Sequence, residues 1–146
     1  MSKDKSSGGF SDSEKAAMQQ RAKELKAEAK ATKKREQGEA ALREVIAAMS
    51  KPDRNLAEGI HAIISEFAPD LWPKTWYGMP AYANESGKVI CFFQGADKFE
   101  TRYATLGFND EAKLDDGNMW PTAFALKKLT ATEQKRIKEL IRKALG

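Results

Sequence analysis

Few side chains in this sequence are of a type that could carry out chemistry. The 146 residues include one cysteine, Cys91, and one histidine, His61. A lone cysteine excludes an intramolecular disulfide framework and a Cys-x-x-Cys metal or redox site. Cys91 stands between Ile90 and Phe92 in a strand-like run, whereas a catalytic thiol is usually partly exposed beside positive charge. We therefore expect a buried thiol at Cys91.

His61 follows Ile60 in a segment with helical periodicity, about 100° round the helix from it. We expect an ordinary residue at the edge of the apolar face, and a nucleophile pair with Cys91 is the alternative. The sequence contains no Gly-rich phosphate loop and no carboxylate pair spaced as an acid and a base. Nothing in the sequence around the one histidine indicates a Ser-His-Asp arrangement. The sequence thus predicts a protein that is not an enzyme.

Most of the aromatic residues fall between Trp76 and Leu126. They could wall a small-molecule pocket, because ligand sites are mostly apolar with a few polar groups. They could also be the core of a small sheet. Gly78 and Pro80 beside aromatic residues indicate an irregular edge, and such edges often border clefts. The candidate ligand-binding residues are Trp76, Tyr77, Met79, Tyr82, Tyr103 and Trp120.

The net charge of +4 is unevenly distributed. Residues 1–50 carry eleven Lys and Arg against eight acids, residues 51–129 nine against eleven, and residues 130–146 five against two. Basic flanks could meet nucleic acid or an acidic protein partner through their electrostatic field. The alternative is a solvated helix surface, since glutamates alternate with the lysines at spacings that form intrahelical pairs.

The elements that must position these side chains begin with a long helical segment. The polar, Gly/Ser-rich residues 1–10 predict a disordered N-terminus without a signal peptide, and residues 11–36 predict a basic helical extension. Ser11 and Glu14 form a capping-box pattern at its start. We expect a break at Gly38 and a second helix over 39–49; one continuous helix through Met49 is the alternative.

A third predicted helix is capped by Asn55 and ends before Pro69, and a last helix follows a capping box at Thr130 and Glu133. Between them lie strand-like segments with a period of two, over 75–83, 88–94, 101–108 and 120–126. The order of elements predicts an α+β fold. We expect a curved, mostly antiparallel sheet of about four to five strands, packed against N-terminal helices and a C-terminal helix.

Several motifs in residues 37–146 resemble one protein family. They are the run Trp76-Tyr77-Gly78-Met79-Pro80-Ala81-Tyr82, the Gly87-Lys88-Val89 hairpin, the run Leu114-Asp115-Asp116-Gly117 and the closing helix. This combination is similar to the YdhG-like family, also called domain of unknown function 1801 (DUF1801). The resemblance implies an α+β domain with a curved antiparallel sheet, and it leaves residues 11–36 outside.

The resemblance implies little about chemistry. A family member from a bacillus is described as a frataxin-like iron chaperone, so iron is the one cofactor that the resemblance brings in, with Asp115 and Asp116 as metal candidates. Turn chemistry explains the same two residues, because Asp bonds its own backbone and Gly117 accepts a positive φ.

We therefore expect a small intracellular, cytoplasmic binding protein for iron or a small molecule, without a membrane segment. An apolar run such as 89–93 is far too short to cross a bilayer. The alternative is a protein or nucleic-acid interaction module that acts through its basic N-terminal helix.

Overall fold

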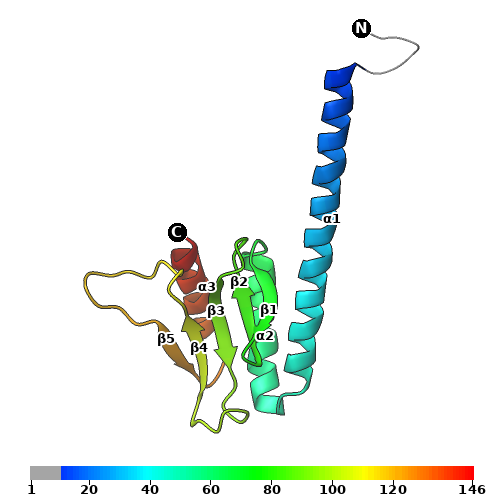
Figure 1. The fold of residues 1–146 in the computed structure, drawn as a ribbon. Helices are drawn as coiled ribbons and strands as arrows, with labels where there is room; N and C mark the ends of the chain where they lie inside the picture. The colour runs from blue at the N-terminus through cyan, green and yellow to red at the C-terminus, as the bar shows by residue number, and fades with distance from the viewer. Residues whose placement is uncertain (1–10) are drawn as a thin grey trace. The chain divides into compact units, whose positions relative to one another are not determined.

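The structure, a computed structural model, describes residues 11–146. Within them lie the helices α1 (Asp12–Ala47), α2 (Lys51–Phe67) and α3 (Ala131–Leu145) and one five-stranded sheet (Figure 1). The segment 1–10, predicted to be disordered, lies outside the described residues. The contacts between residues divide the chain into two compact units, with the boundary between Glu36 and Gln37.

Helix α1 begins where the capping box predicts. The backbone amide of Glu14 donates to the Ser11 hydroxyl over 3.2 Å, and the amide of Ser11 donates to the Glu14 carboxylate over 3.3 Å. These two bonds satisfy amides that the first helical turn leaves without intrahelical partners. The predicted start of the first helix is confirmed.

The predicted break at Gly38 is wrong, and the continuous helix is the observed arrangement. A Cβ atom at Gly38 would lie 2.3 Å from the carbonyl oxygen of Pro73, so the glycine allows α1 to approach the first strand closely. A glycine inside a helix costs about 1 kcal/mol relative to alanine, which the surrounding packing outweighs here. The residue thus serves packing and does not interrupt the helix.

Helix α2 starts earlier than predicted. Ser50 is its N-cap, and Pro52 lies in its first turn, where the missing amide proton of proline costs nothing. The expectation that Asn55 caps this helix is therefore wrong, although the predicted end before Pro69 is confirmed by the C-cap at Ala68.

The segment predicted as one strand over 75–83 is a hairpin of two strands, β1 (Trp72–Trp76) and β2 (Met79–Ala83). Trp76 pairs with Met79, so Tyr77 and Gly78 form a two-residue turn in which both φ angles are positive, +50° and +74°. Such a turn matches the twist of the strands it joins. The single-strand prediction fails because a tyrosine rarely adopts this backbone conformation.

The remaining strands are β3 (Val89–Gln94), β4 (Ala104–Phe108) and β5 (Ala123–Leu126). The sheet order is β1-β2-β3-β4-β5, and every neighbouring pair is antiparallel. Tyr82 pairs with Cys91 but Ala83 pairs with Val89, so Ile90 is an extra residue that forms a bulge in β3. Strands β4 and β5 are shorter than predicted, and Pro121 has no amide proton for a ladder bond near the start of β5.

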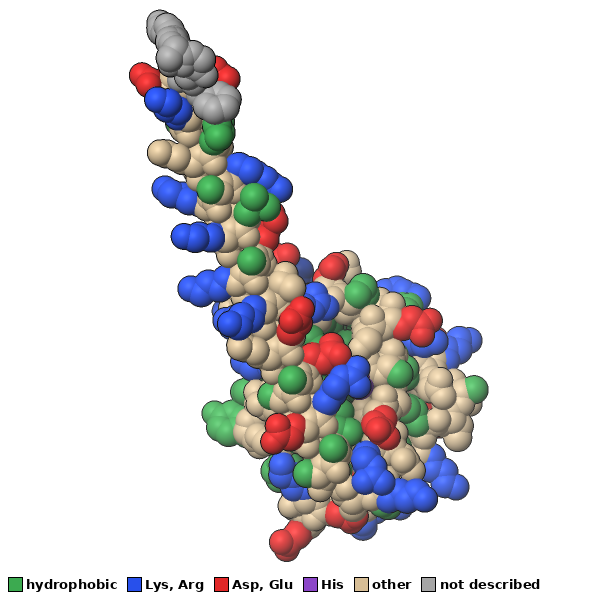
Figure 2. Space-filling view, turned by 90° about the vertical axis from the view of Figure 1, so that its right-hand side faces the viewer, with side chains coloured by type: hydrophobic (Ala, Val, Ile, Leu, Met, Phe, Trp, Pro, Cys, Tyr) green, Lys and Arg blue, Asp and Glu red, His purple; other side chains and the backbone are tan. Residues whose placement is uncertain are grey.

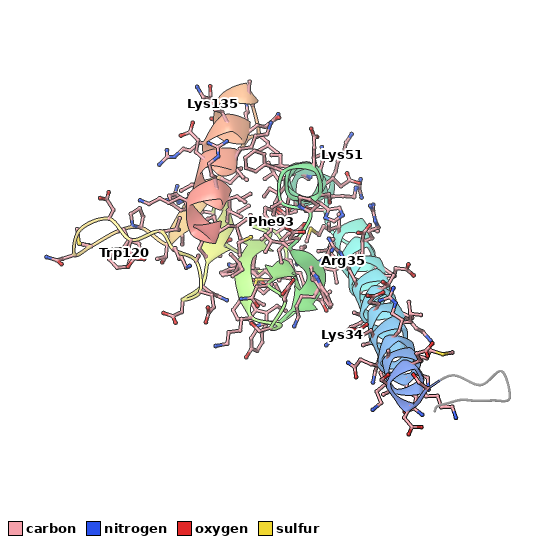
Figure 3. The ribbon with its side chains drawn as sticks, turned by 90° about the horizontal axis from the view of Figure 1, so that it is seen from above. Lys34, Arg35, Lys51, Phe93, Trp120 and Lys135 are labelled. Atoms are coloured by element: carbon pink, nitrogen blue, oxygen red, sulfur yellow. The ribbon has the colours of Figure 1, made fainter. Side chains whose placement is uncertain are left out.

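The main core lies between the sheet and the helices. Leu42 of α1, Ile60 of α2, Phe93 of β3 and Ile141 of α3 are almost completely buried in it. Figure 3 labels Phe93 between the sheet and the helices. Helix α3 starts with the predicted capping box of Thr130 and Glu133. Helices packed on one open antiparallel sheet confirm the predicted α+β fold. Among residues 11–146, no helix is both long and apolar enough to cross a membrane.

Candidate functional site

A buried histidine and tyrosine connect α2 with the sheet. His61 is only 6% exposed and Tyr82 only 1%. The Nδ1 atom of His61 lies 2.9 Å from the Tyr82 hydroxyl, and the two rings are stacked with centroids 5.9 Å apart. His61 was expected at the edge of the apolar face; instead it is buried, because α1 and the sheet cover that side of α2.

Burial determines which atom of this pair holds the proton. It raises the pKa of Tyr82 well above the usual range, mainly through desolvation, so the phenol stays protonated. The phenol needs an acceptor, and Nδ1 of His61 is the one within reach. Nδ1 therefore accepts, and the proton of the neutral imidazole sits on Nε2.

The neutral form of His61 is favoured by its surroundings. Desolvation lowers the pKa of the imidazole below 6.5, the positive charge of Arg43 lowers it further, and the negative charge of Glu39 opposes both. Among the described residues, Nε2 is a buried nitrogen without a hydrogen-bond partner. The nearest carboxylate oxygen, on Glu39, is 4.0 Å away, too far for a hydrogen bond.

The carboxylate of Glu39 is engaged elsewhere. One of its oxygens accepts from Arg43 over 3.0 Å at Nε and 2.9 Å at Nη2, an i,i+4 pair on α1. Both side chains are partly exposed, which makes this pair weak and displaceable. A group with a stronger negative charge could take the place of Glu39 between Arg43 and the Nε2 proton of His61.

Arg43 and His61 border a groove of about 500 Å³. Ligand pockets commonly have volumes of roughly 300–1,000 Å³. Helix α1 supplies Arg43, Ile46 and Ala47, and helix α2 supplies Arg54, Glu58, His61, Ala62 and Ser65.

Two charges in this groove lack an ion-pair partner among the described residues. Arg54 donates only one long bond, 3.4 Å, to the backbone oxygen of Met49, and Glu58 forms no ion pair. With the proton on Nε2 of His61, the groove presents a cation, an anion and a neutral donor. This set suits a small polar ligand with a carboxylate or phosphate at one end and a donor group at the other.

Sequence reasoning missed this groove, although α2 carries a signal for it. Arg54, Glu58, His61 and Ser65 are spaced by four, three and four residues, which places them on one face of a helix. From the sequence, we interpreted α2 by its apolar face, which is the other side of the helix. The contribution of Arg43 depends on tertiary packing and had no local signal.

The structure separates the six predicted ligand-binding residues. Trp76 and Met79 pair across the hairpin on the sheet face opposite the main core, where the Trp76 ring lies 5.1 Å from the ring of Phe92. Tyr77, in the turn, is 81% exposed. Tyr82 points to the other face, because it is three residues from Met79 in the same strand.

The other two predicted residues lie elsewhere. Tyr103 lines a groove of about 640 Å³ whose border also includes Arg102, Lys127 and Lys128, and the Arg102 guanidinium lies 5.1 Å from its ring. Trp120 lies on the long loop before β5 (Figure 3), and its partly buried side chain packs against the main core. The six residues thus belong to several places, and only Trp76, Tyr77 and Met79 are close together.

The predicted metal candidates, Asp115 and Asp116, are exposed in the loop before Gly117, whose φ is +66°. This geometry agrees with turn chemistry. Within residues 11–146, no three His, Cys, Asp or Glu side chains gather closely enough to hold a metal ion. Iron binding stays a prediction of the family resemblance.

Cys91 has the environment that the sequence predicts. The thiol is buried opposite Tyr82 in the β2–β3 ladder, and desolvation raises its pKa to about 12. A thiol that stays protonated is a poor nucleophile. His61 directs Nδ1 to Tyr82, so the pair of Cys91 with His61 does not form.

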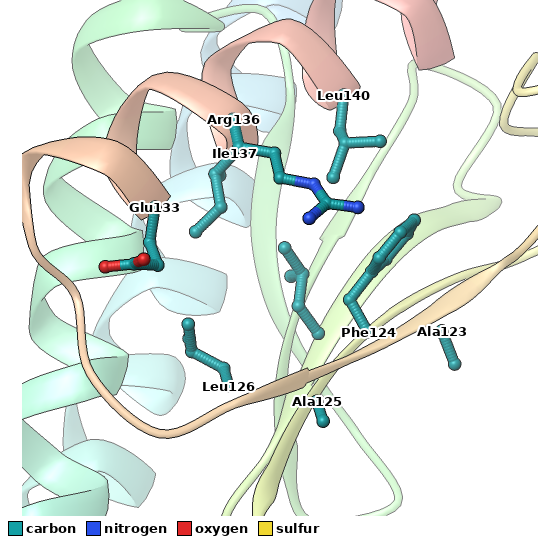
Figure 4. A pocket seen from close by; sticks show the side chains of 9 residues that line it. Ala123, Phe124, Ala125, Leu126, Glu133, Arg136, Ile137 and Leu140 are labelled. Carbon is teal, nitrogen blue, oxygen red and sulfur yellow. The ribbon is translucent and has the colours of Figure 1, made fainter.

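A second cavity, of about 320 Å³, lies between β5 and α3 (Figure 4). Its two charged side chains each contact a neighbouring residue. The Arg136 guanidinium lies 5.7 Å from the centre of the Phe124 ring, and Glu133 belongs to the capping box of α3. This cavity offers apolar surface but lacks an unpaired polar group of the kind that His61 presents.

Comparison with protein-family models, curated proteins and solved structures found no match. The similarity to the YdhG-like family therefore stays a prediction.

Proposed function

We propose that this protein is a non-catalytic binding protein whose ligand occupies the groove between α1 and α2. The observation that carries the proposal is the Nε2 nitrogen of His61, which is buried at the groove and has no hydrogen-bond partner among the described residues. An unsatisfied buried donor costs about 1–3 kcal/mol, so an acceptor atom supplied by a ligand would remove a defect of the free protein.

The charges around this donor define the ligand class. A carboxylate or phosphate oxygen would accept from Nε2 and contact the guanidinium groups of Arg43 and Arg54. Glu58 favours a donor or cationic group at the other end of the same ligand. Metabolites with both features include amino acids and amine-bearing phosphates.

Tyr82 and Cys91 argue against a reaction at this place. Both pKa values are raised by burial, so neither group supplies a base or a nucleophile near neutral pH. The role of Tyr82 is to hold the tautomer of His61 that directs a donor outward. A protein that only binds a ligand needs neither a base nor a nucleophile at its site.

A thermal-shift panel of phosphates, carboxylates and amino acids tests the proposal, with calorimetric titration of each compound that raises the melting temperature. A ligand that binds only the folded state must raise its stability. We expect Arg54→Gln to weaken binding by about tenfold, the loss of one charge-assisted bond of roughly 1.5 kcal/mol. Glu39→Gln should strengthen binding, because it removes the competing carboxylate.

The control is Lys51→Gln, which removes one positive charge from an exposed position on the same helix. It should leave the affinity unchanged. The proposal fails if no compound binds, or if Arg54→Gln and Lys51→Gln have equal effects.

A further inference from the structure

The part of α1 before Gln37 sorts its side chains by type around the helix. Successive residues are rotated by about 100°, which places Lys15, Lys23, Lys26, Lys30, Lys33 and Lys34 within an arc of roughly 100°. All six side chains are exposed. In Figure 2 most of the blue side chains of this segment lie along one edge of the helix. We call these six residues the lysine face.

Glu24 and Glu28 of the same segment lie on the opposite side, whereas Asp12 falls on the lysine arc about one turn before Lys15. Arg21 pairs there with Glu24 over 3.6 Å and with Glu28 over 3.7 Å. Between Lys15 and Lys34, no acid falls on the lysine arc. Within residues 11–146, none of the six lysines forms an ion pair. The glutamates were expected to pair with the lysines, but Glu24 and Glu28 pair with Arg21 instead, and the lysine face keeps its charge.

The composition of the segment argues against a membrane surface as the partner. A helix that lies in a bilayer interface needs a broad apolar face with large side chains such as Leu, Phe or Trp. In residues 12–36 the large apolar side chains are Met18 and Leu25, both about half exposed. A stripe completed by alanines buries too little area to anchor the helix.

The composition also argues against an acidic protein. Protein interfaces are depleted in lysine and rely on aromatic residues, Met and Arg at their centres. The lysine face has none of these. An ammonium group instead suits a phosphate as a point charge, and a row of them suits a row of phosphates.

The length of the row fits a duplex backbone. Lys15 and Lys34 are about 28 Å apart along the axis at 1.5 Å per residue, which is roughly eight base-pair steps. Lysines alone give little discrimination between bases. Between Lys15 and Lys34 the arc holds no Arg or Asn, and Gln19 is its one side chain of a type that commonly reads base edges.

We propose that the lysine face binds the phosphate backbone of a nucleic-acid duplex without sequence preference. The inference is independent of the groove between α1 and α2, because the two surfaces share no residue.

Fluorescence anisotropy with labelled 20-base-pair duplexes of two unrelated sequences tests the proposal on the full chain. Six lysine–phosphate contacts give a slope of log K against log salt of about −5 at most. We expect Lys23→Gln, Lys26→Gln and Lys30→Gln together to make the slope shallower by about 2.7, and to weaken binding at least tenfold at low salt.

The matched control is Lys51→Gln, Lys135→Gln and Lys143→Gln together, which removes three exposed positive charges outside residues 12–36. It should leave the slope within about one unit of the parent. Equal affinity for the two sequences supports the proposal, and a large preference for one contradicts it. The proposal is overturned by absence of binding at low salt, by equal effects of the two triple variants, or by binding to vesicles with anionic lipid without binding to duplex.

Discussion

The proton on Nε2 of His61 is the feature on which the binding role depends. Tyr82 fixes it there from one side of the ring, and the Glu39–Arg43 pair leaves it without an acceptor on the other. A histidine that only filled space in the core would have both nitrogens satisfied. The single unsatisfied donor is therefore a local cost that a ligand can remove.

The pKa of His61 makes the stability of the free protein depend on pH. Its value in the folded protein is below 6.5, so the unfolded chain binds the proton more readily. Stability from this residue is present in full above pH 6.5 and is lost as the pH falls below it. We expect the free energy of unfolding, measured with urea between pH 7 and 5, to fall more in the parent than in His61→Gln.

The comparison with His61→Gln removes the contribution of carboxylates, which titrate in both proteins. Identical pH profiles for the two would mean that the folded protein does not resist protonation of His61.

At the scale of elements, close packing of α1 on β1 sets one wall of the groove. Gly38 makes this possible, since its backbone lies against the carbonyl of Pro73. Arg43 and Ile46 follow on the same helix and line the groove. A shift of α1 away from the sheet would widen the groove and separate Arg43 from His61.

Gly38→Ala tests this packing. Alanine favours the helix by about 1 kcal/mol, but its Cβ atom would lie 2.3 Å from the Pro73 oxygen, and overpacking of this kind costs about 1–3 kcal/mol. We expect a lower melting temperature. Gln37→Ala, at an exposed position one residue earlier, is the control and should change stability by less than about 0.5 kcal/mol. A Gly38→Ala protein as stable as the parent would show that α1 is not held against β1.

The elements also show what sequence patterns can and cannot predict. Both capping boxes were predicted correctly, because their atoms lie within three residues of each other. The Tyr77–Gly78 turn was missed because a tyrosine with positive φ breaks the usual preference. Gly38 was misread because the atom that explains it belongs to Pro73, far along the chain. His61 was misplaced for the same reason.

At the scale of the whole molecule, the two proposed surfaces differ in charge. Residues 1–36 carry ten Lys and Arg against six acids, whereas residues 37–146 carry fifteen of each. The net positive charge therefore comes entirely from the N-terminal part. Duplex binding should depend steeply on salt, while a ligand in the groove meets local charges inside a neutral unit and should respond less.

The most direct test of the binding role uses the single histidine as its own reporter. NMR detection of the imidazole gives one set of signals, from His61, whose pKa can be followed with and without inorganic phosphate. A bound anion favours the imidazolium form, so we predict a saturable shift of the His61 signals and a raised pKa, both reduced in Arg54→Gln. Signals and a pKa that phosphate leaves unchanged, at concentrations that would saturate a site of millimolar affinity, would contradict the account.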